Sequence, residues 1–152
     1  MLFRKEKPKQ KFKDIVKLII IDNMHILAPL ISGRENSEEY VEAITKGADK
    51  VILLQIIDRD FMNKTSAAMG EVMHFSTMMV ELKKMIGKKR KPCDEITEWG
   101  HTIKKILSIA LIQKIDKVVF VNQNNAFFKE ILQELKKNKI NYELVNVFEK
   151  KK

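Results

Sequence analysis

The sequence contains little cysteine, glycine and proline, and it has no long apolar run. Cys93 is the only cysteine, so an intramolecular disulfide is excluded and an oxidising compartment is not indicated. No apolar run approaches the roughly 18–20 residues that a membrane-spanning helix needs. The first residues are charged from Arg4 onward and lack the apolar stretch of a secretory signal peptide. We therefore expect a cytoplasmic protein without a membrane span.

Length and composition predict one globular domain. The chain has 152 residues, of which 45% are hydrophobic and 32% charged, as in folded rather than disordered proteins. Its formal net charge of +9 raises the question of nucleic-acid binding. Much of that charge lies in residues 4–17, 88–91 and 150–152, at the chain ends and between predicted elements, where Lys and Arg usually form solvated tails and loops. No aromatic residues alternate with them, as stacking on single-stranded nucleic acid would require, so we do not expect a nucleic-acid partner.

The spacing of apolar residues predicts alternating strands and helices. Residues 9–22 have the period of an amphipathic helix, although their short apolar run is also compatible with a strand. We treat residues 1–23 as a basic, helical N-terminal extension and residues 24–152 as the domain. Strands are expected at 26–31, 50–58, 92–100, 117–121 and 142–148, and helices after the cap residues 36–37 and at 65–87, 102–114 and 126–137. This alternation predicts a three-layer α/β/α sandwich around a five-stranded, parallel, open sheet.

Methionine is concentrated in one predicted helix. Six of the eight methionines lie between Met62 and Met85, and most of them fall in the helix at 65–87. Two apolar stripes run along this helix, and a helix that is apolar on more than one side is usually buried on more than one side. Methionine suits both core filling and adaptable binding surfaces. The helix is therefore a candidate surface for a protein partner as well as a core element.

Several segments resemble, in their order, the universal stress proteins. Residues 25–58 are similar to the opening of that family, in which the first strand typically runs I-L-V-P-V-D-G-S and the second strand ends L-x-x-V-x-D. Residues 98–121 are similar to the family's E-G-D-P segment, the following helix and the fourth strand. The resemblance covers about residues 24–149 and implies a Rossmann-like sheet with strand order 3-2-1-4-5. It also implies a homodimer through the last strand, residues 142–148, which carries little charge and is a plausible pairing edge.

The sequence departs from this family where ATP would bind. Many members hold ATP through G-x-x-G-x9-G-[ST] after the fourth strand, whereas residues 122–128 read NQNNAFF and contain no glycine. The first-strand aspartate that faces the adenine corresponds to Ile31, and the aspartate of G-D-P corresponds to His101. The resemblance thus implies the fold, while these residues argue against ATP, and we expect no cofactor.

A different ligand could bind where the strands end. In open α/β sheets, ligands bind outside the carboxyl ends of the strands. Amide side chains offer donors and acceptors to a polar ligand, but asparagine is also common in tight turns and helix caps, so both interpretations stay open. The ligand-binding residues expected in this place are Pro29, Ser32, Gly33, Asp58, Asn122, Gln123 and Asn124.

No residue pattern indicates catalysis or a metal. Residues 32–37 faintly resemble the S-G-G-x-D-S pyrophosphate loop of adenylating enzymes, but Arg34 replaces its second glycine and Asn36 its aspartate. The three histidines lack metal-ligand spacing, and Cys93 has no second thiol nearby. The basic run 88–91 would lower the pKa of Cys93 if it lay close to the thiol, although a small strand residue fits as well.

We therefore expect a regulatory or stress-associated protein that is not an enzyme and acts through protein contacts. The alternative is a sensor of a small ligand or nucleotide with a rebuilt pocket at the carboxyl ends of the strands.

Overall fold

The computed structural model describes residues 24–58 and 68–148, but not the side chains of residues 68–72. The helix predicted in residues 1–23 and the first residues of the helix predicted at 65–87 lie outside the described residues.

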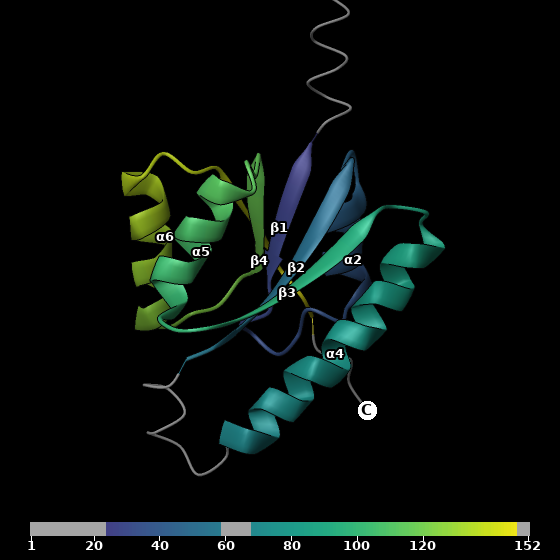
Figure 1. The fold of residues 1–152 in the computed structure, drawn as a ribbon, viewed down its shortest axis with the longest axis horizontal. Helices are drawn as coiled ribbons and strands as arrows, with labels where there is room; N and C mark the ends of the chain where they lie inside the picture. Colours follow the sequence, from purple (N-terminus) through teal and green to yellow (C-terminus); the bar gives the residue numbers. More distant parts are fainter. Residues whose placement is uncertain (1–23, 59–67, 149–152) are drawn as a thin grey trace, which may run out of the picture.

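Strands and helices alternate along the described chain (Figure 1). They are β1 (His25–Pro29), α2 (Glu38–Thr45), β2 (Lys50–Ile57), α4 (Ala68–Lys88), β3 (Cys93–Trp99), α5 (Thr102–Ile112), β4 (Lys117–Val121), α6 (Ala126–Lys137) and β5 (Tyr142–Val145). All strand pairs are parallel, and the order across the sheet is β3-β2-β1-β4-β5. The predicted fold class and strand order are confirmed, except that the last strand ends at Val145 rather than at residue 148.

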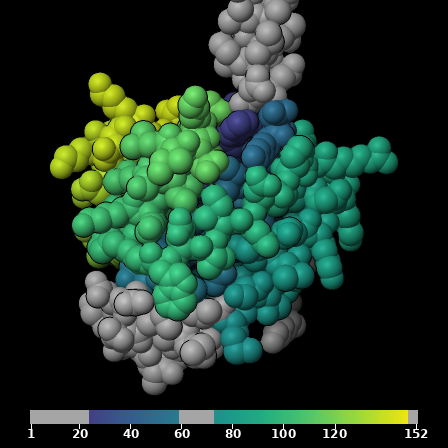
Figure 2. Space-filling model, viewed as in Figure 1, coloured from purple at the N-terminus to yellow at the C-terminus, as the bar shows by residue number. Residues whose placement is uncertain are grey.

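The central strands are apolar on both faces because helices cover both faces. Alternate residues of β1, β2 and β4 contribute to two separate cores, as Ile26 and Leu27 illustrate. The first core packs against α2 and α4, and the second against α5 and α6. These are the two outer layers of the sandwich (Figure 1), and in the space-filling view the helices hide most of the central strands (Figure 2).

The Met-rich helix α4 is buried on one side only. Over the part whose side chains are described, Met78 and Leu82 are in the core, whereas Met73 is 66% and Val80 54% exposed. The prediction that this helix is buried on more than one side is therefore wrong for residues 73–88. The reason is that the sheet lies on only one side of α4, so Met73 and Val80, on the other side, face solvent.

Among the helices of the described residues, none is both long and apolar enough to span a bilayer.

Candidate functional site at the carboxyl edge of the sheet

The predicted ligand-binding residues lie at the ends of strands, or just after them, along one edge of the sheet. Because the sheet is parallel, the turns after β1, β2 and β4 share this carboxyl edge, which lies at the lower side of Figure 1. The strand order reverses between β1 and β4, which is the topological switch point where open α/β sheets bind ligands. Pro29 is the buried last residue of β1. The other predicted residues lie in the turns.

The turn after β1 is built around a buried carboxylate, that of Glu35. This side chain is 0% exposed. Its oxygens accept hydrogen bonds from the backbone N–H of Ser32 at 2.9 Å, the Ser32 hydroxyl at 2.5 Å and the N–H of Gly33 at 3.0 Å. Burial raises the pKa of Glu35, and the hydrogen bonds from Ser32 and Gly33 partly oppose that rise. The donors that would meet an anionic ligand in this turn are thus occupied by the protein's own carboxylate.

The role of Glu35 was not predicted from the sequence, although a local sequence pattern indicates it. The spacing S-x-x-E at residues 32–35 is that of a capping box, in which the acidic side chain reaches back to the backbone N–H of the serine. Here the motif closes the turn that precedes α2, while the helix itself is capped by Ser37, whose hydroxyl accepts from the N–H of Tyr40. Gly33 has φ +83°, a left-handed conformation that favours glycine.

Asp58, after β2, serves the first turn of α5. Its carboxylate accepts from the backbone N–H of Thr102 at 3.0 Å and from the Thr102 hydroxyl at 2.9 Å. The N-cap residue of α5, His101, makes no side-chain capping bond, so Asp58 supplies the cap from another element. A negative charge at this position also complements the helix dipole.

The four-amide turn after β4 is held mainly by its own side chains. Asn125 caps α6 by accepting from the backbone N–H of Phe128 at 2.7 Å, and its side-chain amide donates to Oε1 of the Gln123 side chain at 3.2 Å. Asn122 donates to the side chain of Asn146 at 3.1 Å, next to the end of β5. Asn124 is exposed. Asn122, Gln123 and Asn125 thus make the side-chain hydrogen bonds expected of a turn and a helix cap.

The predicted residues share an edge, but their side chains engage different neighbours. Ser32 and Gly33 bond to Glu35, Asp58 bonds to α5, and Asn122 bonds to the segment after β5. These hydrogen bonds hold the turns after β1 and β4 and the start of α5 in place.

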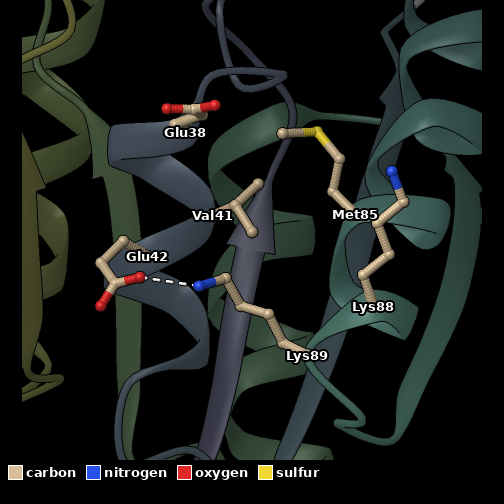
Figure 3. Close-up of a pocket in the computed structure, with 6 residues that line it drawn as sticks. All are labelled: Glu38, Val41, Glu42, Met85, Lys88 and Lys89. Atoms are coloured by element: carbon tan, nitrogen blue, oxygen red, sulfur yellow. Dashed lines mark hydrogen bonds and ion pairs between the residues drawn. The ribbon is translucent and has the colours of Figure 1, made fainter.

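A groove of about 330 Å³ lies elsewhere, between α2 and α4 (Figure 3). Val41 and Met85 form its apolar part, and the Glu42 carboxylate of α2 faces the Lys89 ammonium group that follows α4; Glu38 and Lys88 complete the lining. Lys89 donates to Glu42 at 2.8 Å, which lowers the pKa of Glu42. Sequence reasoning missed this groove because its walls are about 45 residues apart in the chain and carry no local motif.

Burial raises the pKa of the Cys93 thiol to about 11, so the idea that the neighbouring basic run lowers this pKa is wrong; only Lys83 acts in that direction. Among the residues that the structure describes, no group of three or more His, Cys, Asp or Glu side chains is placed to hold a metal ion.

Comparisons with known proteins identify the fold. No protein-family model matches the chain, and no curated protein matches its sequence. The solved structure of hypothetical protein MJ0577, described as a structure-based assignment of biochemical function, is similar with a TM-score of 0.62 at 17% identity; the match covers 83% of this chain and 97% of that one. The crystal structure of hypothetical protein PH0823 is similar with a TM-score of 0.56 at 18% identity, covering 84% and 99%. These likenesses show a shared fold over nearly the whole length of both neighbours.

Proposed function

We propose that this chain is a non-catalytic protein of the universal-stress-protein type, regulatory or stress-associated, which acts through protein contacts and does not bind ATP. The shared fold and the strand order 3-2-1-4-5 support the type, together with the resemblance over residues 24–149.

The buried carboxylate of Glu35 carries the part of the proposal that concerns ATP. A nucleotide phosphate at the turn after β1 would have to compete with this carboxylate for the N–H groups of Ser32 and Gly33. Two like charges at such close range repel each other strongly away from water. The turn after β4 offers no replacement, since it contains no glycine and Asn125 already uses an N–H of the first turn of α6.

Protein contacts are proposed at two surfaces. Met73 and Val80 lie seven residues apart on the solvent side of α4, and therefore on the same face of the helix. An exposed methionine and valine on one face suit a partner protein. The second surface is the edge strand β5, through which we propose a homodimer.

The proposal is tested by denaturing the purified protein and identifying the released small molecules by mass spectrometry, alongside calorimetric titration with ATP and ADP. We expect no stoichiometric nucleotide and no heat of binding at micromolar concentrations. Recovery of an adenine nucleotide, or a micromolar dissociation constant, would refute the ATP part of the proposal.

The groove between α2 and α4 favours a second candidate function, that of a small-ligand sensor. Its volume of about 330 Å³ lies at the lower end of the range of ligand sites, and it combines an apolar patch with both signs of charge. A released small molecule other than a nucleotide would support this function, provided that Glu42→Gln and Lys89→Gln abolish its recovery.

A further inference from the structure

The edge of the sheet opposite the candidate site is strongly basic. In a parallel α/β fold every helix ends, and every following strand begins, at the amino edge, which is the upper side of Figure 1. The four turns at this edge, taken with the adjoining helix ends and strand starts, span residues 46–50, 88–94, 113–117 and 136–142, and we call them the amino-edge surface. They contain eleven basic and three acidic residues, a formal charge of +8 against +9 for the whole chain. The basic residues are Lys46, Lys50, Lys88, Lys89, Arg90, Lys91, Lys114, Lys117, Lys136, Lys137 and Lys139.

Most of this charge is not neutralised by neighbouring carboxylates. Three of the lysines make ion pairs: Lys50 with Asp94, Lys89 with Glu42 and Lys117 with Glu143. Within the described ranges 24–58 and 73–148, the other eight basic side chains have no ion-pair partner. Side chains project outward along this edge from the end of α6 (yellow) and the α4–β3 turn (teal) in Figure 2.

Three of the basic residues occupy backbone positions that normally belong to glycine. Arg90, Lys114 and Lys139 have φ of 57°, 52° and 59°, and they are the non-glycine residues with positive φ in the described chain. They follow α4, α5 and α6, where helices commonly end with a left-handed glycine, as α2 does at Gly47. The helix dipole favours cations near a helix end, but it does not require one at the left-handed position itself. Each of these three turns therefore has a cationic residue where glycine would adopt the backbone conformation more easily, which suggests that the charge itself is used.

Two large apolar side chains lie at the same edge. Leu111 and Ile112, at the end of α5, are 65% and 74% exposed and stand beside the turn that holds Lys114. Exposed leucine and isoleucine side chains contribute nothing to the binding of phosphates alone. An anionic bilayer, by contrast, offers charged headgroups to the cations and an apolar layer beneath them to these two side chains.

We propose that the amino-edge surface docks on an anionic lipid membrane. Its cations bind the headgroup phosphates and carboxylates, and Leu111 and Ile112 reach the boundary between headgroups and acyl chains. The opposite edge, with its buried Glu35 and its turns, then faces away from the lipid.

Substitutions at the three left-handed positions test the proposal, because they should weaken vesicle binding without lowering the stability of the protein. The full-length chain is sedimented with vesicles of one part phosphatidylserine to two parts phosphatidylcholine, and with phosphatidylcholine alone. We expect binding only to the anionic vesicles, weakened by salt. The variant Arg90→Gly, Lys114→Gly, Lys139→Gly should bind about 100-fold more weakly, since each cation near an anionic surface contributes roughly fivefold. Its thermal unfolding midpoint should be unchanged or higher, because glycine adopts the left-handed conformation more easily.

The control removes the same charge far from the amino edge. Arg34, Lys104 and Lys129 lie at or near the carboxyl edge of the sheet, and the variant Arg34→Gln, Lys104→Gln, Lys129→Gln should retain vesicle binding within a few fold. Equal weakening by both triple variants, or equal binding of the wild type to neutral and anionic vesicles, would overturn the proposal.

A second variant separates lipid from nucleic acid. Leu111→Gln with Ile112→Gln changes no charge at exposed positions, and it should weaken vesicle binding while the protein stays folded. The membrane proposal would be refuted if the protein bound duplex DNA or RNA tightly, with a steep salt dependence, and did not bind anionic vesicles. The surface would then be assigned to nucleic acid.

Discussion

A carboxylate without solvent exposure is uncommon, and Glu35 is such a group. Burial raises its pKa above the ordinary value of 4.5, so the native state holds this proton more tightly than the unfolded chain does. The free energy of unfolding contributed by Glu35 must therefore increase as the pH falls from neutral toward 4.5. Glu35→Gln removes this titration. We expect the difference in stability, wild type minus variant, to be larger at pH 5 than at pH 7 in urea denaturation. A difference that shrinks on acidification would show that the hydrogen bonds outweigh burial.

Cys93 supplies a second test at the scale of one residue. With a pKa of about 11, its thiol is about 0.1% ionised at pH 8, far less than a free cysteine. Alkylation by iodoacetamide should therefore be roughly 100-fold slower in the native protein than in urea, as followed by mass spectrometry. Equal rates in the two states would mean that the thiol is neither buried nor held in its neutral form.

At the scale of an element, Asn125 and Asn124 distinguish a capping role from a ligand-binding role. Asn125 accepts from the N–H of Phe128 and so caps α6, while Asn124 is exposed. Asn125→Ala should lower the free energy of unfolding by about 1 kcal/mol. Asn124→Ala, the matched control in the same turn, should change it by less than about 0.5 kcal/mol. Chemical denaturation of both variants decides the matter, and equal effects would exclude the cap.

The elements also show how far sequence reasoning reaches. The helix predicted at 126–137 is the observed α6, because its cap and its apolar period are local features of the sequence. The partner of Asp58 could not be predicted in the same way. Thr102 lies 44 residues away, and no local sequence pattern in either segment indicates that the two residues are in contact. For α4 the apolar pattern predicted the helix, but it did not reveal that only one of its sides meets the sheet.

At the scale of the whole molecule, parallel topology explains both a success and a failure of prediction. Regular alternation of strands and helices was enough to predict the layers, and the family resemblance supplied the order of the strands. The basic runs were judged one at a time as solvated loops. Since a parallel sheet gathers every helix end at one edge, residues 88–91 and 136–139 lie with the other basic turns on a single surface. Examining the basic segments one by one in the sequence does not reveal the total charge of the surface that they form together in the fold.

The two edge strands differ in a way that predicts the homodimer interface. On β3, Asp94 and Glu95 are exposed and paired to lysines, and charge on an edge discourages pairing with another chain. On β5, Leu144 is apolar and 38% exposed. We therefore expect a dimer through β5 in sedimentation velocity at micromolar concentrations, and a monomer for Leu144→Lys. Thr97→Lys, at an exposed position of β3, should remain dimeric, with circular dichroism showing that both variants are folded. A monomeric wild type, or a dimer that tolerates Leu144→Lys, would exclude β5 as the interface.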